Sequence, residues 1–245
     1  MTNTPLNNEP QNNIFILKEI IKETDDVSTF RFIPEQGGMF SFVAGQFVSL
    51  YFLNEDFGGQ GKSYTISSLP GENFLDLSVK KLGEFSSAIH NLKPGNKVKI
   101  IGPSGNFYPM PPFGDLVLLA GGIGISPFYS IICDLEKVND LQKHQIYLFH
   151  SVKKKKHVVF SEKFARISEH CKNFKIIYTV TQEKSTDPPA AEERRIDWEM
   201  IHKHSGEADG KEYFICGSIS FVHDLWQKLK RGGVKEEHIF TESFY

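Results

Sequence analysis

Residues 116–127 place the strongest constraint on how this chain can fold. Residues 116–120 are all apolar and indicate a buried strand. A cluster of glycines follows, and Ser126 and Pro127 then precede apolar residues at helical spacing. Proline suits the first turn of a helix, where its missing N–H would lack a partner in any case. The segment therefore predicts a strand, a tight turn and the start of a helix.

The turn itself, with Gly121, Gly122 and Gly124, is the first candidate binding site. Glycine permits a positive φ and lets a ligand approach the backbone closely. A helix N-terminus behind such a turn is well suited to bind a phosphate group. Because a glycine-rich turn is by itself a weak motif, an ordinary strand-to-helix turn without a ligand is the alternative.

Strands and helices alternate from this turn to the end of the chain. The expected strands are residues 116–120, 145–150, 174–179, 213–216 and 239–242. The expected helices are residues 128–135, 160–170, 198–203 and 221–230. This alternation is typical of a parallel sheet that is covered by helices on both faces.

Short alternating segments dominate the chain before the turn. They lie at residues 14–21, 27–33, 45–52, 63–67, 74–79 and 97–101, and one short helix is expected at 85–92. Many short strands at this spacing indicate an antiparallel barrel or sandwich. Pro109, Pro111 and Pro112 cluster just before the pattern changes, as in a connection between domains. We therefore expect a flexible tail over residues 1–13, a β domain over 14–112 and an α/β domain over 113–245.

Composition excludes several classes of protein. The 245 residues carry a formal net charge of -2, which does not favour nucleic acid or an anionic membrane as a partner. No apolar run approaches the ~20 residues that span a bilayer, and the polar start of the chain lacks the features of a signal peptide. We therefore expect a cytoplasmic protein. Cys133, Cys171 and Cys216 are too far apart for an iron–sulfur or zinc motif, so no metal is predicted.

Four motifs occur together in an order that resembles the ferredoxin–NADP reductase family. Besides the glycine turn, they are residues 62–68 (KSYTISS), residues 83–86 (GEFS) with 102–107 (GPSGNF), and residues 214–217 (FICG) with 241–245 (TESFY). The resemblance covers nearly the whole chain. It implies an antiparallel Greek-key barrel that binds FAD, followed by a parallel-sheet α/β domain that binds a nicotinamide nucleotide.

The resemblance implies an FAD site on the first domain. The ring of Tyr64 would pack on the flavin, and Thr65 would hydrogen-bond near flavin N5, the atom that accepts hydride. Lys62 stands where the family carries an arginine on the pyrophosphate; lysine keeps the charge but lacks the bidentate fork. The start of the helix at Phe85 and the Ser86 hydroxyl would also hold the pyrophosphate. The implied FAD-binding residues are Lys62, Ser63, Tyr64, Thr65, Ile66, Ser67, Gly83, Phe85, Ser86, Ser87, Phe244 and Tyr245.

Simpler roles are open for several of these residues when each is considered alone. Tyr64 and Ile66 would then pack inside the barrel as ordinary strand residues. Ser86 would act as an N-cap of the short helix, a role that is compatible with phosphate binding. Cys216 would be a buried cysteine at the end of a strand, which is the commonest environment of a free cysteine.

The resemblance also implies a nicotinamide-nucleotide site on the second domain. Its residues are Gly121, Gly122, Gly124, Ser126, Pro127, Ser151, Lys153, Cys216 and Gly217. Cys216 would lie near the reacting nicotinamide carbon, although Ser218 stands where the family usually carries a proline. Phe244 or Tyr245 would cover the flavin face on which nicotinamide docks, and Glu242 would serve in proton transfer near the flavin edge. The implied catalytic residues are therefore Thr65, Cys216 and Glu242.

The implied reaction is hydride transfer from NADH or NADPH to FAD, followed by electron transfer to a separate acceptor. A ferredoxin or an oxygenase component is the first candidate acceptor, and a small molecule is the second. A diffusible flavin or ferric-chelate reductase is an alternative within the same enzyme class. A non-catalytic module that binds a nucleotide and regulates a partner is an alternative of another class.

The sequence leaves the choice between NADH and NADPH open. No acidic residue follows the strand at 145–150 to hold a ribose 2′-hydroxyl. The lysines at 153–156 would either hold a 2′-phosphate or lie in a solvated loop. Thr181 and Gln182 stand where NADP-dependent members of the family often carry Ser-Arg, and Arg194 or Arg195 could substitute for that arginine.

Overall fold

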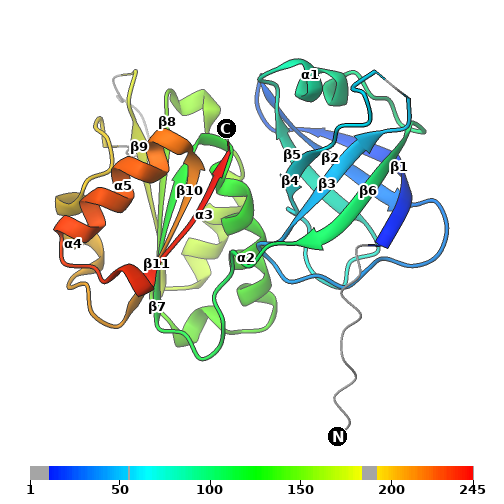
Figure 1. Cartoon of the computed structure of the whole chain (residues 1–245). Helices are drawn as coiled ribbons and strands as arrows, with labels where there is room; N and C mark the ends of the chain where they lie inside the picture. The colour runs from blue at the N-terminus through cyan, green and yellow to red at the C-terminus, as the bar shows by residue number, and fades with distance from the viewer. Residues whose placement is uncertain (1–10, 55, 184–191, 245) are drawn as a thin grey trace, which may run out of the picture.

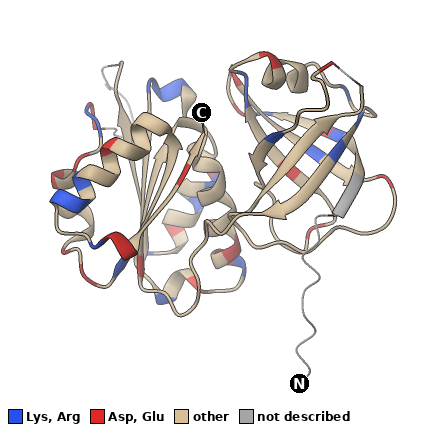
Figure 2. Ribbon diagram, viewed as in Figure 1, with Lys and Arg blue, Asp and Glu red and all other residues tan. Residues whose placement is uncertain are grey.

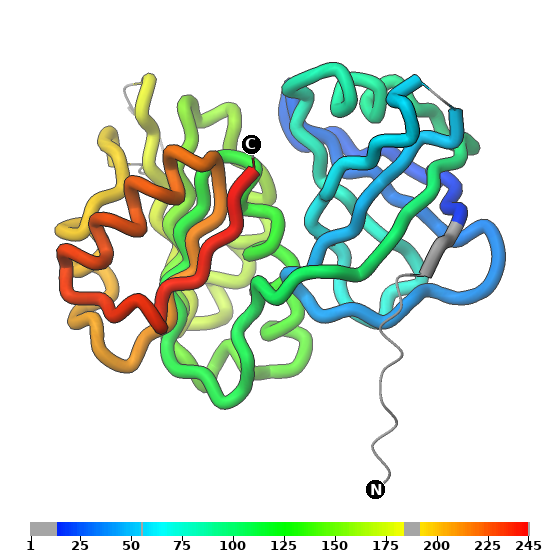
Figure 3. Tube along the Cα trace, viewed as in Figure 1, coloured from blue at the N-terminus to red at the C-terminus, as the bar shows by residue number. Residues whose placement is uncertain are grey.

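The computed structural model describes residues 11–54, 56–183 and 192–244, and side chains from residue 14 onward. These residues form two sheets that lie side by side and are joined by a single crossing of the chain after β6 (Figures 1 and 3). The first sheet is antiparallel and the second is parallel, as the two sequence patterns predict.

The first sheet curls into a barrel of six strands in the order β4-β3-β6-β1-β2-β5. The strands are β1 (Gln11–Lys22), β2 (Val27–Pro34), β3 (Phe47–Phe52), β4 (Lys62–Thr65), β5 (Leu75–Lys80) and β6 (Lys97–Ser104). A bridge between Ile66 and Leu77 brings the two edge strands together and closes the barrel. Inward residues such as Phe15, Phe30 and Ile66 are fully buried and fill its core.

One correction concerns the expected tail. Strand β1 begins at Gln11 and pairs with β6 from that residue onward, so residues 11–13 belong to the barrel and not to a tail. Residues 1–10 of the expected tail lie outside the described residues.

A second correction concerns the short helix α1 (Glu84–His90). Its N-cap is Gly83, not Ser86. The Ser86 hydroxyl lies inside the first turn, accepts hydrogen bonds from the N–H groups of Leu82 and Gly83, and donates to the Gly83 carbonyl. It therefore closes the turn from the third helical position.

The second sheet has the order β11-β10-β7-β8-β9, with all strands parallel. Its strands are β7 (Asp115–Gly121), β8 (Ile146–Val152), β9 (Phe174–Val180), β10 (Lys211–Ser218) and β11 (Ile239–Phe244). Its helices are α2 (Ser126–Lys137), α3 (Ser161–His170), α4 (Trp198–Ser205) and α5 (Ile219–Arg231). Single 3-10 turns occur at Gly122–Ile125, Leu141–Lys143, Lys155–His157 and Glu236–His238.

Helices cover both faces of this sheet, as expected for a buried parallel sheet. Helices α2 and α3 pack against one face with Leu116 and Leu118 of β7, and α4 and α5 pack against the other with Val117 and Leu119 (Figure 1). Because successive strand residues point to opposite faces, the continuous apolar run in β7 supplies both layers.

An apolar contact and a hydrogen bond join the two halves of the molecule. Phe107, which follows the last barrel strand, packs its ring 5.7 Å from Phe128 of α2 and 5.3 Å from Phe214 of β10. Ser130 of α2 also donates a hydrogen bond to the Ser68 carbonyl of the barrel across 3.0 Å. This contact fixes the barrel against the carboxyl end of the parallel sheet.

Charges of both signs are spread over the two halves of the molecule, without a face of one sign in the view of Figure 2. None of the described helices has the length and apolar character needed to cross a membrane.

Candidate functional site

Three adjoining cavities follow the junction between the barrel and the parallel sheet. The barrel cavity, about 380 Å³, is lined by Lys62, Tyr64, Gly83, Phe85, Ser86 and neighbours. The junction cavity, about 190 Å³, is lined by residues of both halves, among them Tyr64, Thr65, Ser78, Gly122, Gly217 and Phe244. The sheet-edge cavity, about 610 Å³, lies over the ends of β7, β8 and β9 and is lined by Gly122, Ser151, Lys153, Thr181, Arg195 and others. Tyr64 connects the first two cavities and Gly122 connects the last two.

The described cavity walls contain most of the residues that the family resemblance singles out. They include Lys62, Ser63, Tyr64, Thr65, Gly83, Phe85, Ser86, Gly121, Gly122, Ser126, Ser151, Lys153, Gly217 and Phe244. The walls do not include Ile66, Ser67, Ser87, Gly124, Pro127, Cys216 or Glu242. Tyr245 lies outside the described residues.

The barrel side of the junction fits a flavin. Tyr64 and Thr65 end the short strand β4, and both residues line the junction cavity. The Thr65 hydroxyl is buried and has no hydrogen-bond partner among the described residues. A buried polar atom without a partner is costly, so a ligand with a hydrogen-bonding edge is the natural complement. Ile66, by contrast, is fully buried in the barrel core.

The glycines of the turn serve different purposes. A Cβ on Gly124 would lie 2.3 Å from the Cys216 carbonyl oxygen, so this glycine allows the turn to pack on β10. A Cβ on Gly121 or Gly217 would collide with the ring of Phe221. Only Gly122 combines a positive φ of 56° with open space, and it lines two cavities. The open approach for a ligand is therefore at Gly122.

His150, which the sequence patterns did not single out, holds this turn in place. It is fully buried at the end of β8, and its Nε2 lies 3.0 Å from the Gly122 carbonyl oxygen. Because a carbonyl can only accept, Nε2 carries the proton and donates it. Burial lowers the pKa of His150 to about 4, so the ring is neutral at physiological pH. No local pattern signals this role, because the contact joins residues 28 positions apart in the chain.

Cys216 and Glu242 lie opposite each other at the ends of β10 and β11. Cys216 is fully buried. Burial raises the pKa of its thiol well above the usual range, and the nearby Glu242 carboxyl raises it further. Burial also raises the pKa of Glu242 to about 7, and its Oε2 lacks a hydrogen-bond partner in the described structure. The pair is therefore a neutral thiol beside a carboxyl group that titrates near neutral pH.

Phe244 is the last residue of β11 and pairs with Ser218 of β10. Its half-buried side chain packs against the apolar cluster on the α2 and α3 face of the parallel sheet, and the residue lines the junction cavity. The parallel pairing thus carries the chain end to the junction, which Figure 1 shows beside the barrel.

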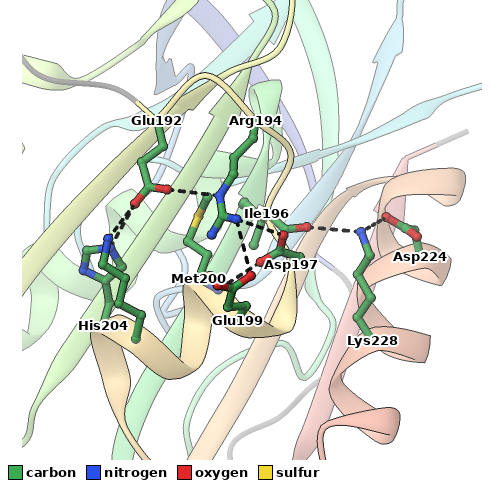
Figure 4. A network of polar contacts seen from close by, with 10 residues as sticks. Glu192, Arg194, Ile196, Asp197, Glu199, Met200, His204, Asp224 and Lys228 are labelled. Carbon is green, nitrogen blue, oxygen red and sulfur yellow. Dashed lines mark hydrogen bonds and ion pairs between the residues drawn. The ribbon is translucent and has the colours of Figure 1, made fainter.

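Two cations line the far end of the sheet-edge cavity. Lys153 follows β8 and Arg195 precedes α4, and neither forms an ion pair with a described residue. The adjacent Arg194 is instead occupied, because it contacts Glu192, Asp197 and Glu199 (Figure 4). Of the two arginines, only Arg195 is thus available to a ligand.

The segment that carries Arg195 is held at both sides. Lys228 of α5 donates a hydrogen bond to the Ile196 carbonyl and pairs with Asp224 (Figure 4). Asp197 caps α4 by accepting a hydrogen bond from the Met200 N–H.

Lys80, on β5 of the barrel, lines both the junction and the sheet-edge cavity and pairs with Asp26. The sequence patterns did not single out Lys80 or Lys228.

Comparison with known proteins agrees with this geometry. Residues 15–108 match the family model of the oxidoreductase FAD-binding domain, and residues 118–226 match that of the oxidoreductase NAD-binding domain. The chain is 30% identical over 235 residues to the glycine betaine monooxygenase reductase subunit of Chromohalobacter salexigens, covering 92% of this chain and 62% of the relative. It is 27% identical over 236 residues to a flavohemoprotein of Bacillus subtilis, covering 94% of this chain and 58% of the relative. The chain thus spans less than two thirds of each of these relatives.

Solved structures share the fold. A ferredoxin NADP+ reductase from Neisseria gonorrhoeae with bound FAD and NADP superposes with a TM-score of 0.79 at 24% identity, covering 97% of this chain and 100% of the other. An Amycolatopsis cytochrome P450 reductase gives a TM-score of 0.83 at 20% identity, covering 98% and 71%. The barrel is an FAD-binding domain and the parallel sheet an NAD-binding domain, and the chain belongs to the ferredoxin–NADP reductase family of flavin-dependent oxidoreductases.

Proposed function

We propose that the chain takes hydride from NAD(P)H onto FAD and passes the electrons to a separate acceptor. The observation that carries this proposal is the junction cavity, whose wall combines Thr65 of the barrel with Gly122 and Gly217 of the parallel sheet. A flavin held by the barrel and a nicotinamide held by the sheet would therefore meet in one cavity. FAD supplies the chemistry there, because it accepts hydride and releases electrons one at a time.

The residues around this space supply binding and orientation. Tyr64 offers an aromatic face to the junction cavity, and the buried Thr65 hydroxyl offers a hydrogen bond that none of the described residues uses. Lys62 and the first N–H groups of α1 line the cavity that would hold the FAD pyrophosphate. Because the Ser86 hydroxyl is already engaged with Leu82 and Gly83, we assign it to closing the turn.

The parallel sheet would hold the nicotinamide nucleotide. Gly122 lies where the junction and sheet-edge cavities meet, and His150 keeps its carbonyl turned toward the sheet. Phe244 lines the junction cavity from the end of β11, so it would have to move when nicotinamide docks on the flavin. Glu242, two residues before Phe244 on β11, would exchange a proton near neutral pH because burial raises its pKa to about 7.

Lys153 and Arg195 favour NADPH over NADH in this proposal. Both are cations without an ion-pair partner in the described residues, whereas Asp26 and Asp224, the acids of the same cavity, are each paired with a lysine. A phosphate monoester at the 2′ position carries about two negative charges at neutral pH and suits such a pair of cations.

Anaerobic mixing of the FAD-loaded protein with NADH or NADPH tests the proposed function. We expect the flavin absorbance to bleach with at least one coenzyme, and faster with NADPH. Absence of bleaching with either coenzyme would leave the non-catalytic nucleotide-binding module as the better account of the chain.

The acceptor is proposed from the relatives. The names of the relatives include a monooxygenase reductase subunit and a cytochrome P450 reductase, so we propose an oxygenase component or a ferredoxin as the acceptor. A diffusible flavin or a ferric chelate is the second candidate. Turnover with a ferredoxin compared with turnover with free FMN separates the two. A cytoplasmic location stays a prediction from the sequence.

A further inference from the structure

A row of hydroxyl groups crosses the seam at which the barrel closes. Thr29 of β2 lies opposite Ser78 of β5 in the antiparallel ladder. The bridge between Ile66 and Leu77 places Thr65 of β4 opposite Ser78 on its other side. Opposed residues of antiparallel strands point to the same face with Cβ atoms roughly 5 Å apart. The three side chains therefore form one line across three strands.

Hydrogen bonds connect most of this line. The Thr29 hydroxyl donates to Glu23 Oε1 at 2.8 Å and lies 2.8 Å from Ser78 Oγ. Because the single Thr29 proton goes to Glu23, the Ser78 hydroxyl donates to Thr29. Ser78 also lines the junction cavity, where the buried Thr65 hydroxyl has no described partner. Thr29 and Ser78 are both almost completely buried, so bulk water does not compete for the hydrogen bonds between them.

Glu23, at the other end of this row of hydrogen bonds, lines a cavity different from the junction cavity. This second cavity of about 440 Å³, here called the rear cavity, is lined by Glu23 together with Thr29, Ser67 and Tyr129. Burial raises the pKa of Glu23, and the nearby Asp76 raises it further. The charged groups that share the rear cavity with Glu23 are Lys22, Arg31, Asp76, Glu162, Lys163 and Arg166. Four of these six groups are cations, so the cavity that Glu23 lines is strongly polar.

We propose that Ser78, Thr29 and Glu23 form a proton path from the flavin in the junction cavity to the rear cavity. The proposal rests on the proposed function, in which NAD(P)H delivers one proton and two electrons as hydride. The acceptor removes only the two electrons, so one proton per turnover must leave the junction. In the path, Thr29 passes its proton to the Glu23 carboxylate, Ser78 passes its own to Thr29, and Ser78 takes one from the cavity. Glu23 then releases the proton into the rear cavity, and no group is oxidised or reduced.

Glu23→Gln and Thr29→Val test this path. The amide that Glu23→Gln introduces can still accept the hydrogen bond from Thr29 but cannot take up a proton, and valine preserves the shape of threonine without its hydroxyl. Each protein is reduced with dithionite and reoxidised with ferricyanide in H₂O and D₂O, so the test does not depend on the coenzyme. We expect reoxidation to slow by roughly 100-fold, the usual scale of a lost proton-transfer group. The hydride step, measured with NADPH, should keep its rate, and Thr29→Ser should restore reoxidation.

Ser205→Ala is the matched control, because it removes a buried hydroxyl that donates to the Ile201 carbonyl within α4, away from the hydroxyl row. A merely structural role for the hydroxyl row would slow both half-reactions or lower stability without a change in the solvent isotope effect, and would overturn the proposal. Loss of the isotope effect in Glu242→Gln but not in Glu23→Gln would also overturn it, in favour of Glu242. Failure of NADPH to bleach the wild-type flavin would instead count against the proposed function alone.

Infrared difference spectroscopy gives a readout that is independent of turnover. A proton that reaches Glu23 produces the carbonyl band of a carboxylic acid when the flavin is photoreduced and then reoxidised. We expect this band in the wild type and in Ser205→Ala, and its loss in Glu23→Gln and in Thr29→Val. A band that persists in Thr29→Val would refute the proposed order of transfer.

Discussion

The contact between the glycine turn and β10 sets a sharp expectation for Gly124→Ala. The new Cβ would lie 2.3 Å from the Cys216 carbonyl oxygen and 2.6 Å from its carbon, whereas ordinary contacts begin at 3.4 Å. Turn and strand must therefore separate by about 1 Å. Both sides of this contact are backbone, so no side chain can yield, and the cost should reach the upper end of overpacking, about 3 kcal/mol.

Gly122→Ala is the comparison, because it makes the same chemical change two residues away. Its Cβ meets nothing within 4 Å, and only the φ of 56° opposes it, at a cost of about 1 kcal/mol. For a chain of this size, 1 kcal/mol lowers the melting temperature by roughly 2–4 °C. We expect a loss of roughly 6–12 °C for Gly124→Ala and of roughly 2–4 °C for Gly122→Ala.

Thermal unfolding of the two apoproteins measures the difference, and titration with coenzyme measures the consequence for the site. Gly122 lines both the junction cavity and the sheet-edge cavity, so the methyl group that Gly122→Ala adds should weaken coenzyme binding despite its small effect on stability. If Gly124→Ala melts within about 3 °C of the wild type, the close packing of the turn on β10 is refuted.

Three further expectations concern the other walls of the site. Tyr64→Ala should lose FAD during gel filtration because it removes the aromatic face; unchanged flavin content would reject that role. Arg195→Gln should weaken binding of 2′,5′-ADP by roughly 10- to 100-fold, the scale of a hydrogen bond to a charged group, but leave 5′-AMP unchanged; Arg231→Gln, a surface arginine at the end of α5, is the control. Glu242 has a raised pKa, so the folded protein binds more protons than the unfolded chain between its ordinary pKa of 4.5 and about 7. Apoprotein stability should therefore fall as pH rises through this range, and Glu242→Gln should flatten that dependence in urea titrations.

Local patterns predicted the architecture because each element is encoded within a few residues. Alternation along the first half of the chain predicted antiparallel strands, and the apolar run of β7 predicted a strand that is buried on both faces. The motif order predicted an FAD-binding barrel and an NAD-binding α/β domain, and the family models confirm both. The glycine turn likewise forms the link from β7 to α2, as its residues indicated.

Contacts between distant segments decided the purpose of individual residues. The sequence pattern does not distinguish the three glycines of the turn. In the structure, a side chain at position 124 would collide with the backbone of β10, and one at position 121 would collide with the ring of Phe221. Nothing close to His150 in the sequence indicated that its ring would hold the Gly122 carbonyl. These distinctions arise from packing between strands that are many residues apart, which no local pattern encodes.

The sequence by itself determined the two domains, their order and the class of ligand that each binds, since these depend on periodicity and on short motifs. Only the tertiary structure decided which arginine lines the sheet-edge cavity. Arg194 and Arg195 are neighbours with the same chemistry, but Glu192 and the acids at the start of α4 pair with Arg194, whereas Arg195 lines the cavity. The hydroxyl row from Glu23 to Ser78 was equally hidden, because its members become neighbours only when the barrel closes.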